Sequence, residues 1–165
     1  MNRECEKVSA KSLILSLESL LEKHHELYSI GLEKTELLKS NRVKELQQLI
    51  QKEQAALSSL QKLEEKRMQE TASFLGVSEN TTLSACAERA QPSERKTLEK
   101  LMESFYDIHE KLRAVNTLNQ QLTHQAMQFV TLTMDMLMPQ ETAAVYTKPA
   151  AKTENKRRPL FDSKA

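Results

Sequence analysis

Apolar residues recur every three or four positions along most of this 165-residue chain. That spacing places them on one face of an α-helix. Three long stretches show the pattern, and the helices that they predict cover residues 9–39, 41–75 and 94–138. The apolar face of the first helix carries Leu13, Leu17, Leu20, Leu27 and Leu38, and that of the second carries Val43, Leu46, Ile50, Leu57 and Leu60.

The predicted boundaries follow from residues that stop or start helices. Residues 40–41, Ser-Asn, favour a turn, and Gly76 suits the left-handed backbone that often ends a helix. Polar residues precede a short helix predicted over 83–90, and Pro92 separates that helix from the last long one. Pro139 ends the last helix, because proline lacks the amide hydrogen and clashes with the preceding turn.

The last long stretch has the most regular pattern. Twelve positions repeat in alternating steps of three and four, and ten of them are apolar. They are Leu98, Leu101, Phe105, Ile108, Leu112, Val115, Asn119, Leu122, Ala126, Phe129, Thr133 and Met136. Such a sustained repeat predicts a long coiled-coil-like helix, in which Asn119 fixes how the helices align.

These elements predict an all-α fold, an elongated antiparallel three-helix bundle of coiled-coil type with a short connector helix. The bundle is expected to occupy residues 1–139, and residues 140–165, which lack apolar periodicity, to form a flexible, disordered tail. At about 1.5 Å per residue, the last helix is roughly 68 Å long and the other two about 47 and 52 Å. The far end of the last helix, about 122–138, therefore lacks a partner in the chain.

That far end is also chemically distinct. No acidic or basic side chain occurs in the 21 residues from Ala114 to Met134, although 28% of the chain is charged, and four methionines fall within residues 127–138. Charge depletion and methionine enrichment are typical of the centre of a protein interface. The stretch is too polar to enter a bilayer, so it predicts a protein partner. The alternative is a structural coiled-coil protein that only self-associates, as a homo-oligomer.

The remaining chemistry argues against an enzyme. The only two glycines, Gly31 and Gly76, cannot build a phosphate-binding loop. The histidines lack acidic or thiol partners at metal-ligand spacing, so no metal or other cofactor is expected. A net charge of +1 and the short basic run at 156–158 argue against nucleic-acid binding. Cys5 and Cys86 lie far apart and the start of the chain lacks an apolar signal region, which favours a reduced intracellular compartment.

Four segments, taken in order, carry a family resemblance. Residues 46–67 read LQQLIQKEQAALSSLQKLEEKR, and the connector at 74–84 reads FLGVSENTTLS. The last helix contains VNTLNQQLTHQAMQFV at 115–130, and MPQETAAVY follows at 138–146. Together these segments resemble the FlgN family of flagellar export chaperones over nearly the whole chain.

The resemblance implies a cytoplasmic, non-enzymatic three-helix chaperone that binds the hook-filament junction proteins FlgK and FlgL before export. Clients of the family present amphipathic C-terminal helices, and holding these helices prevents premature assembly. The family's client site lies on the C-terminal half of the last long helix, which here is the uncharged stretch. The predicted client-binding residues are Leu118, Leu122, Ala126, Phe129 and Val130. The resemblance also makes Tyr146 an anchor that docks the loaded chaperone on the export-gate protein FlhA.

Overall fold

The computed structural model describes residues 9–76 and 82–138. Helix α1 spans Lys11–Lys39, α2 Val43–Leu75, the short α3 Leu83–Arg89, and α4 Pro92–Leu137. No strand occurs within the described ranges. The predicted all-α class is therefore confirmed, and the helix ends differ from the predicted ones by at most two residues.

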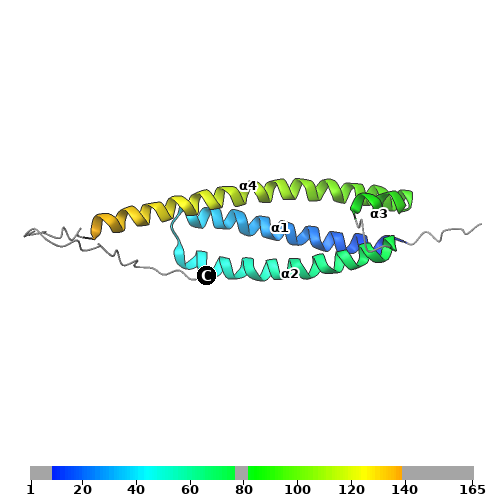
Figure 1. Cartoon of the computed structure of the whole chain (residues 1–165), viewed down its shortest axis with the longest axis horizontal. Coiled ribbons are helices and arrows are strands. Elements are labelled where there is room, and N and C mark those ends of the chain that lie inside the picture. Colours follow the sequence, from blue (N-terminus) through cyan, green and yellow to red (C-terminus); the bar gives the residue numbers. More distant parts are fainter. Residues whose placement is uncertain (1–8, 77–81, 139–165) are drawn as a thin grey trace, which may run out of the picture.

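The three long helices lie side by side in an elongated bundle (Figure 1). Helix α1 lies between α2 and α4 and packs against both. Helix α2 runs in the opposite direction to α1 and α4, as expected when short connections join neighbouring helices. Helix α3 packs against α2 and α4 at the end of the bundle where α1 begins.

Local chemistry explains where the helices end. The backbone is left-handed at Asn41, with φ 54°, and at Gly76, with φ 67°, which confirms the two predicted breaks. The hydroxyl of Thr82 accepts a hydrogen bond from the Ala85 amide at 3.2 Å and so caps α3. Pro92 does not precede α4, as predicted, but is its first residue. Proline is favoured there, because the first-turn amides have no partner within the helix.

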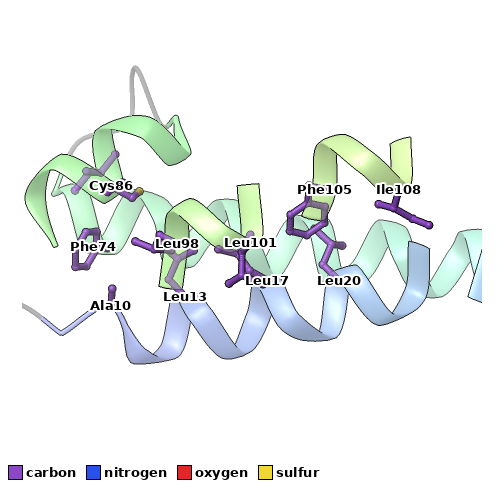
Figure 2. Close-up of a cluster of buried hydrophobic side chains, with 12 residues drawn as sticks. Ala10, Leu13, Leu17, Leu20, Phe74, Cys86, Leu98, Leu101, Phe105 and Ile108 are labelled. Atoms are coloured by element: carbon purple, nitrogen blue, oxygen red, sulfur yellow. The ribbon is translucent and has the colours of Figure 1, made fainter. Parts of the chain in front are cut away.

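The larger core cluster lies at the end of the bundle that α3 covers. In Figure 2, Leu13 and Leu17 of α1 lie close to Leu98 and Leu101 of α4. Phe74 of α2 and Cys86 of α3 close this end, and the Cys86 side chain is fully buried. A second cluster joins α1 to α2 and consists of Leu27, Ile30, Leu37, Leu49 and Ala56.

The last packed layer between α1 and α4 is a polar clamp. Asn119 is buried, and its side-chain amide donates to the Gly31 carbonyl at 2.8 Å. The Thr35 hydroxyl donates to the Asn119 side-chain oxygen at 2.7 Å. One layer earlier, a Cβ on Gly31 would lie only 2.9 Å from a methyl group of Val115, so the glycine lets the two helices approach closely. These contacts fix one alignment of α1 and α4, the role predicted for Asn119.

Candidate functional site

Helix α4 extends beyond the two helices that cover it. None of its described residues after Asn119 is buried, and only Leu122 and Thr133 are half-buried. In Figure 1 this yellow-to-orange end of α4 projects past the turn that joins α1 to α2. We call residues 120–138 the free segment. Its existence was predicted from helix lengths, and the structure confirms that α1 and α2 leave it uncovered.

The free segment exposes an unusual amount of apolar surface. Phe129 retains 71% of its accessible surface and Met136 86%. The large exposed apolar residues of the segment are Met127, Phe129, Val130, Leu132, Met134, Met136, Leu137 and Met138. At 100° per residue these side chains cover well over half of the helix circumference. Monomeric soluble proteins rarely expose contiguous apolar patches of this kind, so the segment is the candidate interaction surface.

The structure distributes the five predicted client-binding residues over different positions on α4. Ala126 and Val130 line a hollow of about 390 Å³ between α4 and the α1–α2 turn, which we call the turn groove. Leu118 lies on the opposite flank of the α1–α4 contact, in a groove that it shares with Leu32. Phe129 is exposed and Leu122 is half-buried. One partner helix in the turn groove would therefore contact only part of the predicted set.

The threonine hydroxyls of the free segment are satisfied within their own helix. The hydroxyl of Thr123 donates to the Asn119 carbonyl at 2.8 Å, and that of Thr131 donates to the Met127 carbonyl at 3.0 Å. Thr133 donates in the same way to the Phe129 carbonyl at 2.8 Å. Because each hydroxyl already has an acceptor, covering the segment with a partner leaves these donors paired. Its three threonines can thus be buried at low polar cost.

A second groove lies between α2 and α4, with α1 as its floor. It has a volume of about 770 Å³, and its apolar lining includes Leu57, Leu60 and Phe105. The rings of His24 and His109 meet there at a centroid distance of 4.8 Å. No local pattern in the sequence shows that faces of α1 and α4 bring these two histidines together. Partial burial, followed by the charge of His24, lowers the pKa of His109 below its ordinary value, although Glu64 acts in the opposite direction.

This lowered pKa predicts a pH dependence of stability. Below about pH 6.5, unfolded chains bind a proton at this histidine more readily than folded ones do, so stability falls as the pH decreases. Glutamine cannot take up that proton, so the His109→Gln variant should lose less stability than wild type on acidification. We therefore expect the melting temperature of His109→Gln minus that of wild type to be larger at about pH 5.5 than at about pH 7.5. Thermal unfolding followed by circular dichroism at both pH values measures the difference. If the difference in melting temperature between variant and wild type is the same at both pH values, His109 does not cause the pH dependence.

Tyr146 and the predicted tail, residues 140–165, lie outside the described residues. Within residues 9–76 and 82–138, no three or more metal-ligating side chains are grouped as a metal site would require. None of the helices in these ranges combines the length and the hydrophobicity needed to cross a membrane.

Comparison with known proteins decides the family. A family model described as FlgN protein matches residues 1–154, nearly the whole chain. The chain belongs to the FlgN family. This confirms the resemblance found in the sequence. Membership in the FlgN family implies a flagellar export chaperone role, binding to hook-associated proteins and no enzymatic activity.

A bacterial relative extends the comparison. The chain is 40% identical over 160 residues to the Bacillus subtilis (strain 168) protein YvyG, which is described only as uncharacterized. The alignment covers 96% of this chain and 100% of YvyG, so the similarity extends over nearly all of this chain. The comparison with solved structures found no match.

Proposed function

We propose that this FlgN-family chaperone holds the C-terminal helices of the hook-filament junction proteins FlgK and FlgL in the cytoplasm. It prevents their premature assembly and delivers them to the flagellar export gate. The observation that supports this proposal most strongly is the free segment of α4, whose exposed apolar side chains no described part of the chain covers. An amphipathic client helix along α4 would occupy the space beyond the α1–α2 turn and bury those side chains.

The proposed contact residues act in different ways. Phe129 and Val130 are exposed, so they are the anchors that gain most from burial, at about 1.5–3 kcal/mol each. Leu122 and Ala126 form the middle of the apolar surface, and Leu118 extends it along the flank that faces Leu32. Because association itself costs about 4–15 kcal/mol in lost freedom, several such anchors must be buried together to reach the net of about 8 kcal/mol of a reversible micromolar complex. Reversibility suits a chaperone that releases its client for export.

Co-purification tests this function against self-association. The tagged chain is expressed with FlgK or FlgL from the same bacterium, and the mass of the purified species is measured by light scattering after size exclusion. We expect a stoichiometric complex with the full-length junction protein and none with a version that lacks its C-terminal helices. If the chain elutes only as a homo-oligomer in every case, the structural coiled-coil alternative is correct, and if it elutes only as a monomer, both the chaperone function and that alternative are wrong.

The second proposed site is Tyr146, whose role rests on the family resemblance. A tyrosine offers a large apolar face and one hydroxyl at low conformational cost, which suits a docking anchor. We expect Tyr146→Ala to bind its client with wild-type affinity but to bind the cytoplasmic domain of FlhA about tenfold or more weakly once loaded. Calorimetric titration of the loaded chaperone into that domain measures the effect, and Tyr146→Phe serves as the control. Unchanged affinity for FlhA would exclude this role.

A further inference from the structure

The α1–α2 turn supplies a second wall beside the free segment. The turn groove is lined on one side by Thr123, Ala126, Met127, Val130 and Thr131 of α4, and on the other by Leu37, Leu38, Asn41, Arg42, Val43 and Leu46. Val43 is the first residue of α2, and 55% of its surface is exposed. An apolar side chain is thus exposed next to the face that carries Ala126 and Val130.

Backbone hydrogen bonds hold this wall together. The Ser40 amide donates to the Glu36 carbonyl at 3.0 Å, and the Arg42 amide donates to the Leu37 carbonyl at 3.1 Å. These bonds satisfy the last carbonyls of α1, as a left-handed residue at a helix end commonly allows. A preformed wall loses little conformational entropy on binding, so its contacts add more fully to affinity.

Charge distinguishes the turn groove from the groove on the opposite flank. Arg42 is the single charged residue among those lining the turn groove, and its guanidinium is paired with Glu45 at 2.9 Å. The groove that contains Leu118 is lined by three charged residues, Glu36, Lys39 and Lys111. Glu36 and Lys39 pair with each other at 2.9 Å, so an uncharged apolar helix face in that groove would desolvate an ion pair and the Lys111 ammonium, whereas the turn groove presents only Arg42.

The size and position of the turn groove indicate which partner would fit it. A cavity of about 150 Å³ holds one benzene ring, so the groove has room for about two large apolar side chains. It shares Ala126 and Val130 with the predicted client site, so a helix lying along this face of the free segment meets the turn. We propose that the client's amphipathic helix seats apolar side chains in the turn groove and contacts Val43 of the turn directly. This inference rests on the proposed function.

Val43→Asp tests the inference with little risk to the fold, because an acidic residue in the first turn of a helix is favourable. We expect it to weaken binding of the C-terminal segment of FlgK or FlgL about tenfold or more, measured by calorimetry, since a carboxylate would be buried among apolar groups. Leu15→Asp is the matched control, because Leu15 is also exposed, at 63%, and lies in the first turns of α1, which begins at the end of the bundle opposite the free segment. It should bind like wild type.

Photocrosslinking gives an independent measurement. A photoreactive amino acid at position 43 should crosslink to the client segment, and the same group at position 15 should not. Wild-type affinity of Val43→Asp, equal losses in Val43→Asp and Leu15→Asp, or no crosslink from position 43 would each overturn the inference. If wild type itself binds neither junction protein, the proposed chaperone function fails, whereas normal wild-type binding with an unaffected Val43→Asp removes only the role of the turn.

Discussion

Phe129→Asp is expected to weaken binding of the FlgK or FlgL C-terminal segment by about 30-fold to 1000-fold, or about 2–4 kcal/mol. Phe129 is 71% exposed in the free chain, so the carboxylate remains hydrated until a client covers it. Desolvating that charge in the complex is unfavourable, and the anchor's apolar contacts are lost as well. Calorimetry measures the affinity, and circular dichroism should show a melting temperature within about 2 °C of wild type.

Gln128→Asp is the matched control for this prediction. It adds the same charge to the same uncharged stretch, but one residue is a rotation of about 100° around the helix and places the charge on the polar face. We expect its client affinity to stay within about threefold of wild type. A marked fall in the melting temperature of Phe129→Asp would mean that Phe129 is part of the protein's own core and not of a client site.

Gly31→Ala is expected to destabilise the fold by about 1–2 kcal/mol, although alanine normally stabilises a helix relative to glycine by about 1 kcal/mol. The new Cβ would lie 2.9 Å from a methyl group of Val115, a β-branched side chain with little rotational freedom. Either the valine leaves its rotamer or α4 moves away from α1, and both responses weaken the adjacent bonds of Asn119. Urea unfolding measures the change in the free energy of unfolding.

The sign of that effect should reverse when the clash is removed. In a Val115→Ala background, the atom of residue 115 that faces the new Cβ is its own Cβ, at 3.9 Å, which is an ordinary contact. Only the gain in helix propensity then remains, so the double variant should exceed Val115→Ala in stability by up to about 1 kcal/mol. If Gly31→Ala changes the free energy of unfolding equally in both backgrounds, Gly31 does not act by letting the two helices approach closely.

The sequence predicted much of the fold because its helices are encoded locally. Apolar spacing gave their number and order, while Gly76 marked the end of α2 and Asn41 the turn before it. The uncovered end of α4 also followed from the sequence, since helix length is proportional to the number of residues. The charge-free stretch then singled out the same end as an interaction surface without reference to any neighbour.

Only the tertiary structure decided which side chains face one another. A location on the C-terminal half of a helix does not specify a helix face, so the predicted client-binding set grouped Leu118 with Val130 although they lie on opposite flanks of the α1–α4 contact. The close approach of Gly31 to Val115 depends equally on how two helices rotate and slide against each other.

The sequence by itself therefore determined that an uncharged apolar helix end remains without a partner. The turn groove beside it exists only because packing sets the α1–α2 turn against α4, and that packing is a property of residue pairs distant in the chain.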